Sequence, residues 1–376
     1  MARRIKKRFE YPLCFFVPSY NEESSLPNIE QNIEKAFNVF PNSRFYFSDN
    51  CSTDGTRSGL FKLRDKFGEN RINLYMQKSN IGFSKNMLAL ERIPENSMVA
   101  VLGANDTLFT PGLIHLGSEL EKLPDLDMVM CNWAYYKEST SGKKEPFWEG
   151  DVETPFEADT LDDFFSKHMF PPHGIMQYVC KREKLLKMRP YSEANFMSPQ
   201  LGAFFDSFPC KFKAIGSPPL ALVRHLEEEG WRSSANRILE THFSQAQETI
   251  IHLKRSHDSN RLSFYQFNRI GREFATIQVK LAFQLLRESW GAWQGGVLEK
   301  YRLSIKIISG SYKMGRMHDF FGPTLFFVFL TKLILIHILS IILPHSGFTS
   351  VRALYQQMKL MIKNVTTFLK SFSPAK

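Results

Sequence analysis

Short apolar runs alternate with helical patterns along the first half of the chain. Runs typical of buried strands occupy residues 13–17, 45–47, 72–76 and 99–102. Between the first two runs, apolar residues recur at helical spacing, as at Ile29, Ile33 and Phe37. Strands that alternate with helices in this way favour right-handed β/α units. We therefore expect an α/β fold with a Rossmann-like, mostly parallel sheet flanked by helices.

Polar side chains follow all four predicted strands at the point where each strand ends. Because the carboxyl ends of parallel strands meet at one edge of a sheet, these side chains are expected to lie together, where ligands bind in open α/β sheets. A single polar residue there is also typical of an ordinary turn, so one such residue supports either interpretation. Four converging strand ends favour a binding cleft. In strand order the residues are Tyr20 and Glu22, Asp49 and Asn50, Asn80, and Asp106.

The charge balance and the cysteines narrow the class of protein. A formal net charge of +10 over 376 residues favours a polyanionic partner, such as nucleic acid, an acidic membrane surface or a phosphorylated substrate. Five scattered cysteines without a C-x-x-C pair are typical of a reduced compartment without a disulfide framework or zinc site. The basic start lacks the apolar stretch of a secretion signal, so we expect the globular part to face the cytoplasm.

Four segments carry the candidate chemistry. In order they read VPSYNEE at 17–23, SDNCSTDGT at 48–56, NIGFSKN at 80–86 and LGANDTL at 102–108. Walker A and G-x-G-x-x-G phosphate loops are absent from the sequence. Together the four segments resemble the signature of family 2 glycosyltransferases of the GT-A fold, over about residues 11 to 225. The resemblance implies an inverting transfer of a sugar from a nucleotide-diphosphate donor, with a UDP-sugar favoured.

The resemblance also implies roles for individual residues. Asp49, followed by Asn50, matches the aspartate that contacts the nucleotide base. Asn80 to Lys85 match the segment near the diphosphate, where a helix N-terminus and the lysine also suit an anion. The first-strand residues that flank the base and ribose are Pro18, Tyr20 and Glu22.

Asp106, with Asn105 before it, matches the last aspartate of the family's metal-binding D-x-D region. This implies a Mg²⁺ or Mn²⁺ ion that bridges Asp106 to the diphosphate and acts as a Lewis acid. Gly103 and Asn105 stand where acidic residues are usual, which leaves weak metal binding or metal independence open. His225, in a segment that resembles the closing strands of the family, is a second candidate ligand or an ordinary surface residue.

An inverting transfer needs a general base, usually a carboxylate, to take the proton of the acceptor hydroxyl. The family commonly places an acidic pair before a helix like the one predicted at 198–208, but Met197 and Ser198 stand there. Glu193 is the first candidate for the base and Asp206 is the second. The mid-helix position of Asp206 also suits a structural role. Trp133, Tyr135, Trp148 and His173 either line the acceptor pocket or belong to ordinary packing.

The C-terminal third carries a long apolar run at 320–343, which has the length of a membrane span. Lys332 interrupts it and basic residues flank both ends, which conflicts with a single crossing. An in-plane or re-entrant segment, followed by a basic amphipathic helix at 351–369, fits better and predicts contact with an anionic membrane surface. The alternative is a buried core helix or an interface in a homo-oligomer.

The sequence predicts four parts and one principal function. The parts are a basic segment 1–10, a glycosyltransferase domain 11–228, a helical region 229–318 and a membrane-associating segment 319–376; within the domain, 11–112 is the nucleotide-sugar half and 113–228 the acceptor half. The predicted acceptor is lipid-linked or a polysaccharide, at the cytoplasmic face of the cell membrane. The alternative is a catalytically weak or inactive nucleotide-sugar-binding scaffold subunit. No nucleic-acid partner is expected, because no recognisable nucleic-acid-binding module is present.

Overall fold

The computed structural model describes residues 7–138, 144–149, 152–169, 171–172, 174–224 and 248–271. All of these belong to one compact unit. His173, His225, the apolar run at 320–343 and the amphipathic helix at 351–369 lie outside the described residues. Within the described ranges, no helix combines the length and the apolar character that crossing a bilayer requires.

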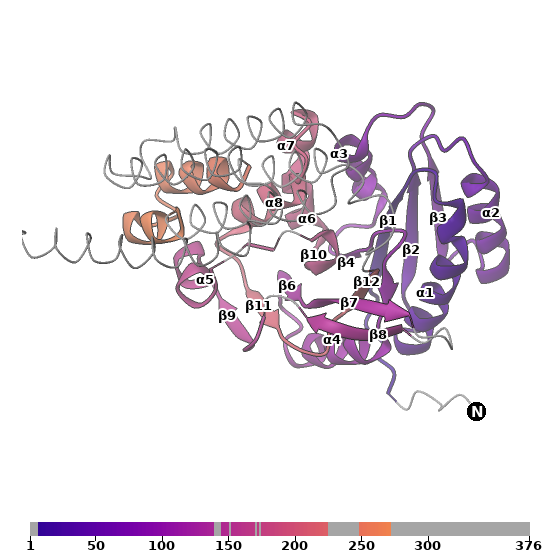
Figure 1. Cartoon of the computed structure of the whole chain (residues 1–376), viewed down its shortest axis with the longest axis horizontal. Helices are drawn as coiled ribbons and strands as arrows, with labels where there is room; N and C mark the ends of the chain where they lie inside the picture. Colours follow the sequence, from indigo (N-terminus) through magenta and orange to yellow (C-terminus); the bar gives the residue numbers. More distant parts are fainter. Residues whose placement is uncertain are drawn as a thin grey trace, which may run out of the picture. The chain divides into compact units, whose positions relative to one another are not determined.

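An eight-stranded sheet forms the centre of the unit (Figure 1). Most neighbouring strands are parallel, and β10 and β9 run antiparallel to the strands they pair with. This confirms the predicted mostly parallel α/β sheet. The strands, in spatial order, are β3 (Ile72–Met76), β2 (Arg44–Asp49), β1 (Cys14–Ser19), β4 (Met98–Val101), β10 (Tyr178–Lys181), β6 (Met128–Cys131), β11 (Phe212–Ile215) and β9 (Phe156–Ala158).

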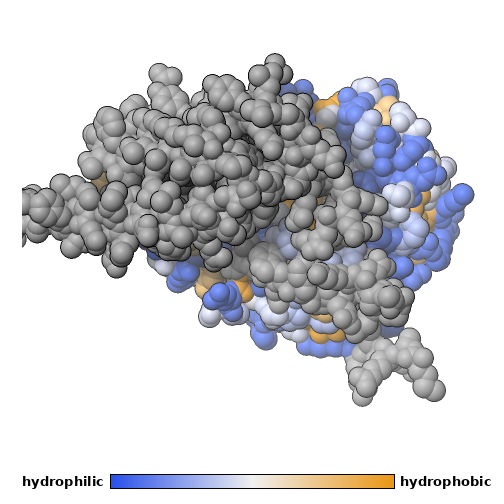
Figure 2. Space-filling model, viewed as in Figure 1, coloured by the Kyte–Doolittle hydropathy of each residue, from blue (hydrophilic) through white to orange (hydrophobic). Residues whose placement is uncertain are grey.

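Helices cover the sheet through apolar faces that the sequence pattern already indicated. On α1 (Leu26–Val39), Ile29, Ile33 and Ala36 are buried against the core. Phe15 and Phe45, on adjacent strands, stack with their ring centroids 4.7 Å apart. The outward surface over α2 (Thr56–Phe67) is mostly hydrophilic (Figure 2). The other helices are α4 (Thr110–Lys122), α5 (Leu161–Lys167), α6 (Arg182–Leu185), α7 (Arg189–Glu193) and α8 (Pro199–Ser207), with 3-10 turns η1 (Glu23–Ser25), η3 (Ile175–Gln177) and η4 (Leu186–Met188); residues 248–258 and 264–271 are also helical.

The helix predicted at 85–93 differs from the observed structure. The chain forms a four-residue helix, α3 (Phe83–Asn86), and continues as a 3-10 turn, η2 (Met87–Arg92). Asn86 is buried and bonds to β2 through both side-chain atoms: it accepts from Ser48 Oγ at 2.7 Å and donates to the Ser48 carbonyl at 2.9 Å. Such side-chain bonds compete with regular helix formation. A contact with β2 therefore overrides the local helical pattern.

A second, four-stranded sheet adjoins the point where β4 ends. Its order is β5 (Thr107–Leu108), β12 (Ala221–Arg224), β7 (Trp133–Glu138) and β8 (Lys144–Glu149). Thr107 follows Asp106 directly and pairs with Leu222 of β12. The short loop that carries Asp106 is therefore anchored in one sheet at its start and in the other at its end.

Candidate functional site

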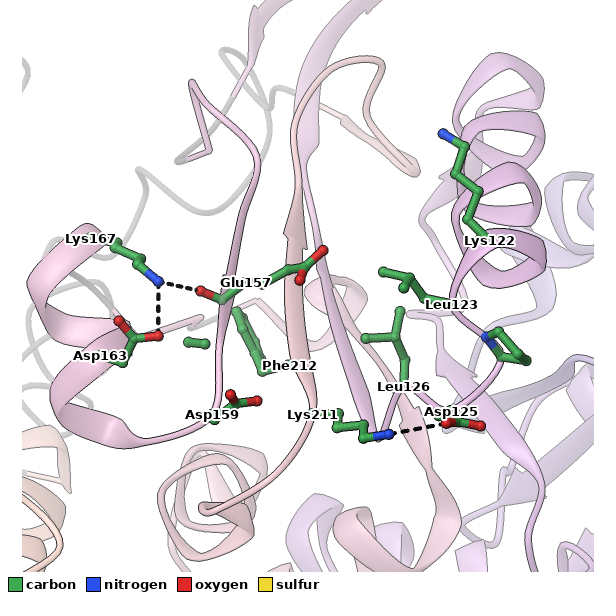
Figure 3. A pocket seen from close by; sticks show the side chains of 12 residues that line it. Lys122, Leu123, Asp125, Leu126, Glu157, Asp159, Asp163, Lys167, Lys211 and Phe212 are labelled. Carbon is green, nitrogen blue, oxygen red and sulfur yellow. Dashed lines mark hydrogen bonds and ion pairs between the residues drawn. The ribbon is translucent and has the colours of Figure 1, made fainter.

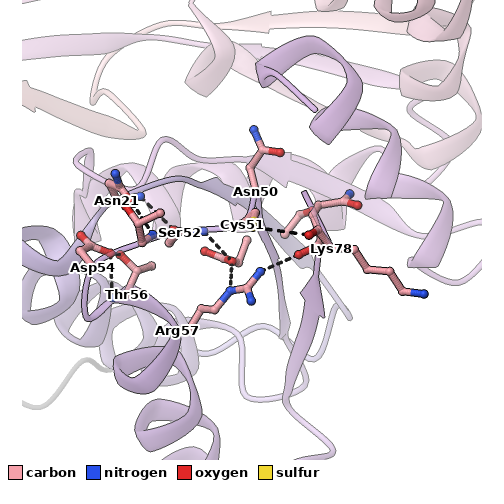
Figure 4. A network of polar contacts seen from close by, with 12 residues as sticks. Asn21, Asn50, Cys51, Ser52, Asp54, Thr56, Arg57 and Lys78 are labelled. Carbon is pink, nitrogen blue, oxygen red and sulfur yellow. Dashed lines mark hydrogen bonds and ion pairs between the residues drawn. The ribbon is translucent and has the colours of Figure 1, made fainter. Parts of the chain in front are cut away.

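The loops after β1 and β2 are joined to each other by hydrogen bonds (Figure 4). The Asn21 amide donates to Ser52 Oγ at 2.9 Å, and Asn21 Oδ1 accepts from the Thr53 amide at 2.9 Å. The Glu22 amide donates to Thr56 Oγ1 at 2.7 Å. Strands β1, β2, β3 and β4 are parallel, so these loops lie at one edge of the sheet, which we call the carboxyl edge.

The loop after β3 joins the same network. Asn50 Nδ2 donates to Asn80 Oδ1 at 2.8 Å, and Asn50 Oδ1 accepts from the Ile81 amide at 2.9 Å. Gly82 has a φ of +82°, a conformation that favours glycine. The structure thus brings together Asn50 and Asn80 as predicted. Lys85 is exposed on α3. This helix has only four residues, which is too short for the anion site predicted at its N-terminus.

Asp49 ends β2 as a fully buried carboxylate. Its Oδ2 accepts from Arg57 Nε at 2.6 Å and from the Ser52 amide at 3.1 Å, while Arg57 also donates to the Gln77 carbonyl at 2.6 Å (Figure 4). Its Oδ1 is buried and has no hydrogen-bond partner among the described residues. A buried acceptor without a partner is costly and calls for an explanation. A donor group on a bound ligand would satisfy it.

Asp106 lies at the carboxyl edge, in the loop between β4 and β5. Its side chain is buried, and Oδ2 accepts from the Gly103 amide at 3.1 Å. Burial, with a smaller contribution from the nearby charge of Glu22, raises the pKa of this carboxyl to about 7. Burial likewise raises the pKa of half-buried Glu22, which accepts a 2.7 Å hydrogen bond from Ser25. Two carboxyl groups with raised pKa values therefore share this part of the edge.

The other residues predicted to line the site flank these two carboxyl groups. Tyr20 follows β1 and exposes 44% of its surface, whereas Pro18, within β1, is half-buried. Asn105 is exposed beside buried Asp106. All three therefore lie at the carboxyl edge, at or next to the ends of β1 and β4.

Polar residues of α1 hold the Asp106 loop, and sequence reasoning missed them. Asn28 and Asn32 each donate to the Asp106 carbonyl at 2.7 Å. Asn32 also accepts from the Leu108 amide at 2.8 Å, and Lys35 donates to the Leu108 carbonyl at 3.0 Å. The signal in the sequence is polar residues spaced by four and three on one helix, beside the apolar face. They fix the position of the buried carboxylate.

Gly103 stands where an acidic residue is usual in the family, and the structure gives a steric reason. A Cβ atom at this position would lie 2.6 Å from Asp106 Oδ2, well inside van der Waals contact. The close approach allows the Gly103 amide to bond the Asp106 carboxylate. Among the described residues, no three side chains of the metal-binding types gather in one place. Asp106 therefore suits a metal only as a single protein ligand, with phosphate and water oxygens completing the shell.

The two candidate bases have different surroundings. Glu193 ends α7, leaves 61% of its side chain exposed and lies 3.8 Å from Arg189. Asp206, within α8, accepts from Arg261 Nη2 at 2.9 Å and also from the Tyr191 hydroxyl. Charge-assisted hydrogen bonds are stronger than neutral ones, so the bond from Arg261 holds the Asp206 carboxylate in place. The base role of both residues stays a prediction.

Trp133 and Tyr135 were predicted to face an acceptor sugar. Both lie half-buried on β7, and their rings meet edge to face with centroids 4.9 Å apart. Burial raises the pKa of the Tyr135 hydroxyl. The side chains of Trp148 and His173 lie outside the described residues.

A pocket of about 530 Å³ lies at the opposite edge of the sheet, where β6 and β11 begin (Figure 3). Its charged side chains pair with each other, as between Lys211 and Asp125 at 3.0 Å and between Lys167 and Asp163 at 2.8 Å. Because β6 runs parallel to β4, this amino edge lies away from Asp106. The pocket is therefore separate from the predicted site.

Comparison with known proteins agrees with this geometry. Residues 14–181 match the model of Glycosyl transferase family 2. No curated protein gives a significant match. Among solved structures, S. aureus TarS 1–349 in complex with UDP-GlcNAc is similar with a TM-score of 0.57 and 14% identity, over 90% of this chain and 92% of that chain. Its complex with UDP gives a TM-score of 0.54 and 14% identity, over 88% and 89% of the two chains.

A mannosyltransferase from Pyrobaculum calidifontis is more distant, with a TM-score of 0.47 and 13% identity over 90% of this chain and 91% of that chain. The TarS similarities confirm the predicted GT-A-like fold. They extend beyond the segment matched by the family model, which ends at β10. The family match covers residues 14–181, which include the loops of the carboxyl edge, so this chain carries a glycosyl transferase family 2 segment that supports a glycosyltransferase.

Proposed function

We propose that this glycosyltransferase takes its sugar from a UDP-sugar and binds the nucleotide at the carboxyl edge, with the base at Asp49. The observation that carries the proposal is the buried Asp49 Oδ1, which has no partner among the described residues. An acceptor at this place favours a base with a ring N–H on its pairing edge, as uracil has at N3 and guanine at N1, whereas cytosine offers only its exocyclic amine. The similarity to TarS, whose structure is known with UDP, supports uracil.

The diphosphate would then lie toward Asp106. We infer that Asp106 holds a Mg²⁺ or Mn²⁺ ion as its single protein ligand, which fits its burial and its raised pKa. A bound ion would neutralise the charge of the departing nucleoside diphosphate. Lys85, exposed in the segment after β3, adds positive charge that suits the same group. Asn28 and Asn32 hold the Asp106 loop in place.

The transfer is proposed to be a direct, inverting displacement. The oxygen of an acceptor hydroxyl attacks the anomeric carbon while the bond from that carbon to the phosphate oxygen breaks. The acceptor proton passes to a carboxylate base. A lipid-linked or polysaccharide acceptor is proposed, and the Trp133–Tyr135 pair and the net charge of +10 suit a sugar- and phosphate-bearing molecule.

Turnover of nucleotide sugars tests the donor assignment. UDP or GDP release is measured for the full chain with UDP-GlcNAc, UDP-glucose, UDP-galactose and GDP-mannose, with Mn²⁺ or EDTA and with water as acceptor. We expect turnover of at least one UDP-sugar and none of the GDP-sugar. UDP binding without turnover of any donor would support the scaffold alternative. Turnover of GDP-mannose alone would contradict the assignment of uracil.

Membrane association is a separate proposal that the sequence alone supports. The apolar run at 320–343 and basic residues such as Lys359 and Lys363 lie outside the described residues. We propose that they hold the protein at an anionic cytoplasmic membrane surface. In flotation assays the full chain should rise with vesicles containing phosphatidylglycerol and less with pure phosphatidylcholine. Equal flotation of K359E/K363E and wild type would contradict the electrostatic part.

A further inference from the structure

A carboxylate from outside the family segment lies at the start of α8. Glu248 begins the described part of a helix at 248–258, and only 8% of its surface is exposed. Its Oε1 accepts from the Met197 amide at 2.5 Å, and its Oε2 accepts from the Ser198 amide at 2.9 Å. Ser198 is the residue immediately before α8. A segment about fifty positions away in the sequence thus supplies a buried carboxylate to this turn.

The same turn contacts the carboxyl edge. The Ser84 hydroxyl donates to the Phe196 carbonyl, so residue 196 bonds the loop after β3 and residues 197 and 198 bond Glu248. Helix α7, which leads into this turn, packs against α3, and the two lie side by side in Figure 1. Ser84 is adjacent to Lys85 in the segment assigned to the diphosphate. Three consecutive residues therefore connect Glu248 with that segment.

The chemistry of Glu248 suits proton transfer. A carboxylate has about four lone-pair positions, and its two backbone hydrogen bonds occupy one on each oxygen. Burial raises the pKa of Glu248, although the two amides act in the opposite direction, and a raised pKa makes the ionised form a stronger base. By contrast, Asp206 is bound by Arg261, and Glu193 is mostly exposed to solvent.

We propose that Glu248 is the general base of the sugar transfer, an inference that rests on the proposed function. The proton of the acceptor hydroxyl moves to a carboxylate oxygen of Glu248 as the hydroxyl oxygen bonds to the anomeric carbon. The electron pair of the breaking bond leaves with the nucleoside diphosphate. Glu248 is thus a catalytic residue of this chain, reached through the turn at 196–198.

Replacing Glu248 by glutamine tests the proposal because glutamine keeps the shape and one amide acceptor. Using the UDP-sugar that wild type turns over, we expect E248Q to lower kcat by about 10²- to 10⁴-fold, the usual loss for a missing general base. The KM for that UDP-sugar and the Kd for UDP should stay within about twofold, because uniform binding is untouched. E95Q, at a glutamate with 83% of its side chain exposed, is the matched control and should turn over like wild type.

The pH profile separates catalysis from structure. In the pH profile of wild-type kcat, the acid limb should have an apparent pKa above the ordinary range of glutamate. This limb should be absent in E248Q. His252, one turn further along the helix, does not interfere because burial lowers its pKa to about 4, which keeps it neutral above that pH. The charged groups that interact around His252 are Asp206, Arg255 and Arg261.

Three outcomes would overturn the assignment. They are wild-type kcat in E248Q, an unchanged acid limb in E248Q, and a parallel loss of UDP affinity and melting temperature that accounts for the lost activity. If E248Q does not fold, E248D decides: it keeps the charge but shortens the reach, so its kcat should fall at least about tenfold at unchanged UDP affinity. Wild-type kcat in E248D would then contradict the proposal. If wild type turns over no nucleotide sugar, the proposed function itself fails.

Discussion

The carboxyl edge and the α8 turn are built in different ways. At the carboxyl edge, three loops that each follow their own strand hold one another through short hydrogen bonds, such as those between Asn21 and Ser52 and between Asn50 and Asn80. At the α8 turn, the bonds come from residues 248–271, as between Glu248 and Ser198 or between Arg261 and Asp206. One region is fixed by neighbouring strand ends, the other by a later segment that docks on it.

This difference indicates how binding and catalysis can be separated. The nucleotide site is formed by the sheet, its loops and the polar residues of α1 that hold the Asp106 loop. The α8 turn also needs the docking of residues 248–271, which the bond from the Ser263 amide to Asp162 at 2.7 Å reinforces. We therefore expect substitutions at the carboxyl edge to change nucleotide or metal binding, and substitutions in residues 248–271 to leave that binding intact.

The largest effect in the carboxyl edge is expected for Asp106→Asn. Asparagine keeps the shape and can still accept from the Gly103 amide, but it removes the charge proposed to hold the metal. Sugar-donor turnover should fall by about 10²- to 10³-fold, the loss typical of removing one electrostatic group from an active site. Asp125→Asn, at an exposed aspartate of the opposite edge of the sheet, is the control and should retain activity. A fully active D106N would remove Asp106 from the mechanism.

Gly103→Asp should lower turnover even though an acidic residue is usual there. The new Cβ would lie 2.6 Å from Asp106 Oδ2, so the loop or the carboxylate must move. A displacement of this order at a reacting group can reduce the rate by about 10²-fold. The comparison is UDP release by G103D and wild type at saturating Mn²⁺. Higher activity in G103D would mean that charge matters more than the close approach.

The pH dependence of metal binding should reveal the burial of Asp106. Its pKa is raised to about 7, and a metal must displace the proton below that pH. The Mn²⁺-dependent gain in UDP affinity should fall about tenfold per pH unit below pH 7 and level off above it. Titration calorimetry between pH 5.5 and 8.5 measures this. The slope should vanish in D106N, and the same slope in both proteins would assign the titration to another group.

The smallest effect on the nucleotide site is expected for Arg261→Gln. This removes the 2.9 Å ion pair with half-buried Asp206 but leaves Arg255 at 3.9 Å. The free energy of unfolding should fall by about 1 kcal/mol, because a partly exposed charged hydrogen bond is lost. UDP affinity should not change. Weaker UDP binding in a folded R261Q would show that the two regions are coupled and contradict their separation.

The same contrast explains what the sequence predicts and what it leaves out. Asp49, Asn50, Asn80 and Asp106 could be placed together because each follows a recognisable strand, and parallel strands end at one edge. The carboxylate at the α8 turn could not be placed from the sequence, since Glu248 lies fifty positions from Ser198 and no periodic pattern links the two residues. The predicted helix at 85–93 failed for a related reason, because Asn86 bonds to Ser48 on another element.

UDP binding by Asp49→Asn is the most direct test of the carboxyl edge as a nucleotide site. The control is Asp159→Asn, an exposed aspartate of the pocket at the amino edge. Calorimetry should show UDP affinity about 10- to 100-fold weaker for D49N, since a hydrogen bond to a buried charged group contributes about 1.5–3 kcal/mol. D159N should bind like wild type. Unchanged binding by D49N with weakened binding by D159N would place the nucleotide at the opposite edge and contradict the assignment.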